Sequence, residues 1–179
     1  MTGQVAKSIL ILVIIIIVVT ADLAGIKAIP GLAVVIQPSL LLTMILTLTQ
    51  GWRFGLLAAL VAGGFYQLVS TFTPWAPILA FVGTATLVSF LTRRVLTTKS
   101  TMSFLSLMAI GTFGFYLILV GVAGVAYALN PHQSKPLLLM WLPPLLFQLI
   151  SHPFLGWLFW RLTNRRQRLT QATTPDYQF

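Results

Sequence analysis

Three kinds of side chain that often carry chemistry are absent or scarce in this sequence. It has no cysteine, which excludes a disulfide framework and a thiolate metal site. Its only acidic residues are Asp22 and Asp176, so a carboxylate pair for acid–base catalysis would need both, and Asp176 lies in a polar tail. Its only histidines, His132 and His152, are too few for the ligand set of a zinc site.

Recognisable catalytic motifs are lacking as well. The glycines fall within apolar runs and lack the Lys-Ser/Thr pattern of a phosphate-binding loop. The chain has neither a nucleophile elbow nor a His-x-x-x-His pair. The sequence therefore predicts a protein that is not an enzyme, with no catalytic residue, no metal and no cofactor.

Charged residues are also rare, at 7 per cent, whereas hydrophobic residues reach 58 per cent. A soluble domain has about 25 and about 45–50 per cent. The 179 residues are therefore predicted to form one all-α membrane domain, residues 1–164, followed by a basic polar tail, residues 165–179. The net charge of +9 does not indicate nucleic-acid binding, because the basic residues sit at the ends of apolar runs.

Hydropathy and breaker residues predict a bundle of about six transmembrane helices. Ser8 to Val19 alone has the length of a signal-peptide core, but the run continues to Lys27, which favours a retained first span. Pro38 disfavours helix at Gln37, so the second span is predicted to be kinked or partly re-entrant. The predicted spans are Ser8–Ala28, Leu32–Thr49, Trp52–Val69, Ile78–Leu91, Phe104–Leu129 and Leu137–Trp160.

The basic residues predict the orientation of these spans. With six spans and a cytoplasmic N-terminus, nine basic residues face the cytoplasm and two, Lys27 and Lys135, face outward. Five spans would change the ratio to five against six, so the count favours six, with both termini in the cytoplasm. The nine are Lys7, Arg53, Arg93, Arg94, Lys99, Arg161, Arg165, Arg166 and Arg168.

A stripe of small residues marks the third predicted span. Gly51, Gly55, Ala59, Gly63 and Gln67 follow one another at intervals of four and so share one slowly drifting helix face. Small residues let a neighbouring backbone come close, and in a membrane such packing drives helix association. We interpret the stripe as a helix-packing face or a partner interface, with the internal position favoured because it lies between two connected spans.

A few polar residues lie inside the apolar runs. Asp22, near the end of the first span, is costly in a membrane unless it is paired, hydrated or protonated. It is predicted to be an interfacial residue that touches water, a buried helix contact, or a group that takes part in catalysis or proton transfer. Gln148 and His152 lie four apart, beside Ser151, and predict a hydrogen-bonding cluster inside the bundle. Ser39, Thr43 and Thr47 share one face and offer hydrogen bonds to a neighbouring helix.

The order of these features resembles a known family. Gln37-Pro38-Ser39 leads a leucine run, and Gly51-x-x-x-Gly55 opens the next span. That span ends in Gly63-Gly64-Phe65-Tyr66-Gln67-Leu68-Val69-Ser70, and a turn with Pro74-Trp75-Ala76 precedes a span that ends in Arg93-Arg94. The pattern, which covers roughly Ile9 to Arg94, resembles the MreD family of bacterial rod shape-determining membrane proteins.

This resemblance implies a six-span, non-enzymatic scaffold in the bacterial cytoplasmic membrane. Its implied partners are the membrane proteins of the cell-elongation complex, which builds peptidoglycan, and the lipid bilayer; nucleic acid is not among them. The sequence departs from the family at Gln67, where an acidic residue is usual, at Gln37-Pro38-Ser39 in place of Arg-Pro-Asp, and at Pro74-Trp75-Ala76 in place of Pro-Phe-Gly.

The same resemblance supplies an alternative. The MreD fold is similar to the substrate-binding membrane subunit of energy-coupling-factor vitamin transporters, which dock on a coupling subunit through small-residue faces. Ala24 and Ala28 make one such pair, although Lys27 lies within it. A vitamin, the small-molecule ligand of this alternative, would need a partly polar pocket near the outer face. The candidate lining residues are Gln67, Trp75, Asn130 and His132.

Overall fold

A computed structural model describes residues 2–25, 35–69, 75–95, 101–129 and 138–172. The described chain contains six α-helices, of which five are long and apolar enough to cross a membrane. The prediction of an all-α multi-pass bundle is thereby confirmed. The helices are α1 (Thr2–Ala24), α3 (Pro38–Thr49), α4 (Trp52–Val69), α5 (Ala76–Val95), α6 (Thr101–Leu129) and α7 (Leu138–Ala172).

The exception in length is α3, which falls in the second predicted span. Its 12 residues rise about 18 Å, less than the roughly 30 Å hydrocarbon core of a bilayer. Gln37, with φ −124° and ψ 89°, lies outside the helix, and Pro38 is the first helical residue. The predicted span Leu32–Thr49 is therefore not one helix, because Pro38 has no N–H to continue a helical ladder from the residues before it.

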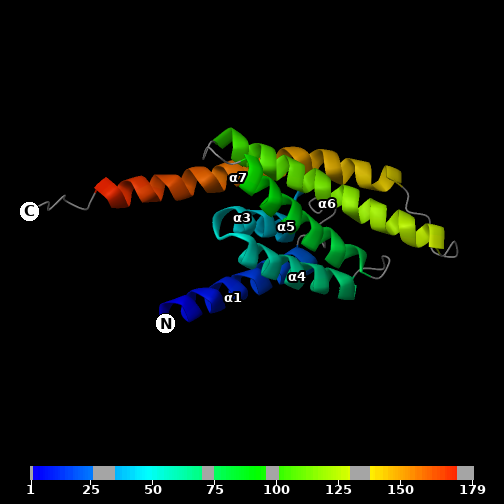
Figure 1. The fold of residues 1–179 in the computed structure, drawn as a ribbon, viewed down its shortest axis with the longest axis horizontal. Helices are drawn as coiled ribbons and strands as arrows, with labels where there is room; N and C mark the ends of the chain where they lie inside the picture. Colours follow the sequence, from blue (N-terminus) through cyan, green and yellow to red (C-terminus); the bar gives the residue numbers. More distant parts are fainter. Residues whose placement is uncertain (1, 26–34, 70–74, 96–100, 130–137, 173–179) are drawn as a thin grey trace, which may run out of the picture.

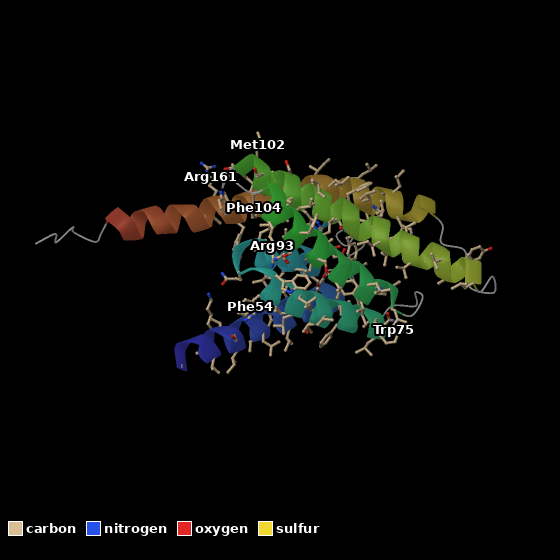
Figure 2. All side chains as sticks on the ribbon, viewed as in Figure 1. Phe54, Trp75, Arg93, Met102, Phe104 and Arg161 are labelled. Atoms are coloured by element: carbon tan, nitrogen blue, oxygen red, sulfur yellow. The ribbon has the colours of Figure 1, made fainter. Side chains whose placement is uncertain are left out.

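Successive helices run back and forth, so their ends gather at two ends of the bundle (Figure 1). The N-terminal end of α1 and the C-terminal end of α7 lie at the same end. Arg93 and Arg161 lie at that end as well, while Trp75, in the turn between α4 and α5, lies at the other (Figure 2).

The core forms where the helices pack on one another, with one face of α1 included. A row of aromatic rings links four of them: Tyr66 on α4 meets Phe81 on α5 at 5.3 Å, and Phe81 meets Phe115 on α6 at 5.0 Å. Tyr116 on α6 then lies 6.3 Å from Trp141 on α7. Edge-on ring pairs of this kind add to the dispersion energy that holds lipid-embedded helices together.

The helix α1 lies at the margin of the bundle and packs only along one face. Its buried residues Ile11, Ile15, Val19 and Asp22 are spaced by four, four and three, which is one face of a helix. The other faces present isoleucine, leucine and valine outward, which is the expected composition of a helix surrounded by lipid. The single buried stripe carries Asp22 to the centre of the bundle.

The last helix is the longest. With 35 residues, α7 rises about 52 Å, and three prolines, Pro143, Pro144 and Pro153, lie inside it. The boundary predicted at residue 165 does not appear as a break, since the helix continues to Ala172. The basic residues of the predicted tail up to that point therefore extend the last membrane helix.

Candidate functional site

The centre of the bundle holds a hydrogen-bonded group of side chains that we call the polar cluster. One oxygen of Asp22, Oδ2, accepts three hydrogen bonds. The Ser39 N–H donates at 3.1 Å, the Ser39 hydroxyl at 2.5 Å and the Tyr66 hydroxyl at 2.7 Å. The contacts join α1, α3 and α4. The members of the cluster are Asp22, Gln37, Ser39, Tyr66, Thr112 and His152.

The position of Asp22 follows from the broken second span. A helix start leaves backbone N–H groups without partners. The N-cap residue of α3, Gln37, makes no side-chain cap, and Pro38 has no N–H, so Ser39 carries the first free donor. Asp22 supplies the missing acceptor from another helix. A carboxylate at this place also interacts favourably with the positive end of the α3 dipole.

His152, on α7, hydrogen-bonds the backbone at the same break, one residue before Pro38. Its Nε2 accepts the backbone N–H of Gln37 at 3.2 Å, and its Nδ1 lies 3.0 Å from the hydroxyl of Thr112. That hydroxyl donates its own proton to the carbonyl oxygen of Met108 at 2.9 Å. Nδ1 must therefore carry the ring proton, and the imidazole is neutral with both nitrogens bonded.

Two neighbours of His152 extend the contacts of α7. Gln148, one turn earlier and 1 per cent exposed, hydrogen-bonds the Tyr116 hydroxyl on α6. The Ser151 hydroxyl donates to the carbonyl oxygen of Val35 at 2.5 Å. Together with His152, these residues bind α7 to α6 and to the segment that precedes α3.

The chemistry of this arrangement is that of a structural clamp. Asp22 and His152 hold two backbone N–H groups, those of Ser39 and Gln37, that Pro38 leaves without helical partners. In lipid, a backbone N–H without a hydrogen-bond partner costs several kcal/mol, as other buried polar groups without partners do. The cluster therefore fixes the start of α3 against α1 and α7.

The structure distinguishes the buried interpretation of Asp22 from the interfacial one. Its side chain is 1 per cent exposed and accepts from α3 and α4, so it is a buried helix contact and not an interfacial residue that touches water. Lys27, a basic residue five positions further along the chain, lies outside the described residues.

The small-residue stripe faces the neighbouring helices of the same chain. Gly55 lies against Thr47 on α3, and a Cβ at Gly63 would be 2.7 Å from the backbone Cα of Ile78 on α5. Ala59, between them, is fully buried. Gly51 departs from the stripe: it precedes α4, in the turn after α3, and its φ of +91° is one that side chains rarely adopt.

Gln67, at the end of the stripe, closes a turn. Its Oε1 accepts the N–H of Trp75 at 2.8 Å, and Trp75 has a positive φ of 74°. The amide thus holds the backbone where α4 connects to α5. Of the residues proposed to line a vitamin pocket, Gln67 is bonded to this turn and the Trp75 side chain is 67 per cent exposed, while Asn130 and His132 lie outside the described residues.

The polar face of α3 differs in part from its prediction. Ser39, Thr43 and Thr47 are all buried, as one face should be. Only Ser39 reaches another helix; the Thr43 and Thr47 hydroxyls donate to the carbonyl oxygens of Ser39 and Thr43 one turn back. Threonine satisfies its hydroxyl within its own helix at low cost, which leaves no donor for the neighbour.

Two members of the cluster, Tyr66 and Thr112, were not predicted from the sequence. Tyr66 belongs to the motif that carries the family resemblance, and its hydroxyl needs a partner wherever the ring is buried. Tyr66 follows Ala59 by seven residues and therefore lies on the same packing face. A hydroxyl at that position could have been predicted to take part in a buried hydrogen bond. Thr112 gave none, because a threonine in a membrane helix usually bonds its own backbone.

No family model matches the chain, and neither a curated protein nor a solved structure is detectably similar to it. The resemblance to the MreD family therefore stays a prediction, and the geometry of the bundle carries the functional argument.

We expect His152→Leu to destabilise the protein by about 1–3 kcal/mol, since it leaves the Gln37 N–H buried without an acceptor. His152→Gln should recover part of the loss, because a glutamine oxygen reaches roughly as far as Nε2. Thermal unfolding of the purified protein in detergent measures both. Ile150→Leu, at a 74 per cent exposed position two residues away, serves as the control. Equal unfolding temperatures for His152→Leu and the control would contradict the clamp.

Proposed function

We propose that the chain is a non-enzymatic membrane scaffold. The observation that supports this best is the use of its intramembrane acid and imidazole: Asp22 and His152 each hold a backbone N–H of the break at Pro38. Enzymes and proton-coupled carriers keep such groups available to a substrate or a proton path. Here the groups join five helices, α1, α3, α4, α6 and α7, into one body.

The biological setting of the scaffold follows from the family resemblance. We propose that it serves the cell-elongation machinery in the bacterial cytoplasmic membrane, where it holds together an actin-like filament, its bitopic membrane partner and the enzymes of peptidoglycan synthesis. Pro38, which leads the second span, and the motif from Gly63 to Tyr66 support this assignment. Tyr66 belongs to the polar cluster, and Pro38 lies next to two of its members, Gln37 and Ser39.

Crosslinking in the native membrane tests the proposal. A tagged chain should capture the filament protein and peptidoglycan synthases above the level captured by an unrelated small membrane protein. Capture of an ATPase or a transport coupling subunit instead, together with a rise in unfolding temperature in the presence of a vitamin, would replace the scaffold with the transporter subunit.

Both termini are proposed to be cytoplasmic. The described basic residues Lys7, Arg53, Arg93 and Arg161 belong to helix ends that gather at one end of the bundle, and positive charge marks the cytoplasmic side. Reporter fusions at Asn130 and after Phe179 measure this. We expect a periplasmic reporter to be active at Asn130 only; activity at the C-terminal fusion would contradict the six-crossing topology.

A further inference from the structure

One end of the bundle carries positive charge that has no acidic partner among the described side chains. Lys7, Arg53, Arg93 and Arg161 are exposed there, on α1, α4, α5 and α7. Among the described side chains the single acidic one is Asp22, which is buried and accepts from Ser39 and Tyr66. The four cations therefore need counter-ions from outside the described part of the chain.

The last part of α7 adds to this charge. From Arg161 to Ala172 the helix rises about 18 Å, and Figure 1 shows it reaching beyond the other helices. Arg165, Arg166 and Arg168 fall in this extension. Positions 161, 165 and 168 are spaced by four and three, so they lie on one face of the helix.

Two tryptophans set the depth at which this extension begins. The Arg161 guanidinium lies 5.3 Å from the centre of the Trp157 ring, and Trp160 stacks on Phe104 of α6 at 5.1 Å. Tryptophan concentrates at the boundary between hydrocarbon and headgroups. Arg161 is therefore placed at the level of the lipid phosphates, and the residues after it lie at or above that level.

We propose that this basic end, made of Lys7, Arg53, Arg93, Arg161 and the α7 positions 165, 166 and 168, binds the headgroups of anionic phospholipids. A guanidinium forms paired hydrogen bonds with a phosphate, and a row of basic residues next to a membrane helix is attracted to anionic lipid. The tryptophan anchors favour lipid over an acidic protein, because they hold the arginines at the membrane surface itself. This inference does not depend on the proposed scaffold function.

Lipid selectivity of the full chain tests the proposal. The protein is placed in bilayers of phosphatidylglycerol and phosphatidylcholine, one of them brominated, and tryptophan quenching reports which lipid lies against it. We expect phosphatidylglycerol to be preferred at least about fivefold, the effect of one basic residue near an anionic surface. The preference should fall toward one in the variant R161Q/R165Q/R166Q/R168Q and as salt is raised.

The matched control is R161K/R165K/R166K/R168K, which keeps the charge and should keep most of the preference. Equal quenching by both lipids in the wild type, or an unchanged preference in the glutamine variant, overturns the proposal. Loss of preference in inorganic phosphate but not in chloride of equal ionic strength overturns it in favour of a soluble phosphate. Absence of lipid preference with salt-sensitive capture of an acidic protein overturns it in favour of that partner.

Discussion

Asp22→Ala is expected to lower the amount of folded protein in the membrane more than any other single change to the polar cluster. It removes the acceptor of three hydrogen bonds, which the Ser39 N–H, the Ser39 hydroxyl and the Tyr66 hydroxyl donate. Each buried donor without a partner costs about 1–3 kcal/mol. The free energy of unfolding should therefore fall by several kcal/mol, measured by thermal unfolding in detergent and by abundance in the membrane fraction.

Smaller changes at the same contact should follow a fixed order. Asp22→Asn keeps one acceptor oxygen and is expected to cost about 1–3 kcal/mol. Tyr66→Phe removes one donor to Asp22 and a hydrogen-bond partner of Gln37 and Ser39, and is expected to cost about 0.5–1.5 kcal/mol. The double variant Asp22→Ala/Tyr66→Phe should cost less than the two single variants added together, because it has no Tyr66 hydroxyl that needs an acceptor.

A control on the same helix separates this effect from a general weakness of α1. Thr20 is exposed, and its hydroxyl donates to its own helix at the Ile16 carbonyl oxygen. Thr20→Val should leave abundance nearly unchanged. Wild-type abundance and unfolding temperature for Asp22→Ala would show that Asp22 is not the cap of α3.

Much of the fold could be predicted because a membrane restricts the choices. Every backbone polar group must be bonded within the segment, so a long apolar run has to be a helix. The third predicted span, Trp52–Val69, has the same bounds as α4, because Gly51 before it cannot continue a helix at its positive φ. The break before α3 was also readable, since Pro38 removes a donor whatever surrounds it.

The partners of the polar residues could not be predicted. The hydrogen bonds of Asp22 and His152 join residues 17 to 115 positions apart in the chain, and helix periodicity says nothing about which helices become neighbours. Three interpretations of Asp22 therefore remained open from sequence. The face of α3 that carries Thr43 was identified correctly, but its hydroxyl groups had a local acceptor that the pattern did not weigh.

The break and the clamp together suggest why this chain tolerates polar groups at all. A helix that starts inside the membrane exposes N–H groups where water cannot reach, and Asp22 and His152 remove that cost. In return, residues 37–39 are bonded to Asp22 on α1 and His152 on α7, which bond in turn to Tyr66 on α4 and Thr112 on α6. The proposed scaffold function would use such rigidity, because partners must find their contact surfaces in fixed positions.

Gly63→Leu is expected to abolish stable folding. A Cβ at this position would lie 2.7 Å from the Cα of Ile78, a backbone atom of α5, and cannot be accommodated unless α4 and α5 move apart. Overpacking costs typically about 1–3 kcal/mol for a few added methylenes, and backbone contact raises it. Gly63→Ala, which adds only the Cβ, should fall within that range. Membrane abundance and thermal unfolding measure both.

The adjacent glycine provides a matched control. A Cβ at Gly64 would have no atom within 4 Å, so Gly64→Ala gains helix propensity without a clash and should equal or exceed the wild type in stability. Because Gly63 packs inside the chain, whatever Gly63→Ala protein remains folded should still be captured with the wild-type partners. Normal abundance of Gly63→Ala with loss of those partners would instead place the Gly63 face at an interface with another protein, and normal abundance with normal capture would remove the packing argument altogether.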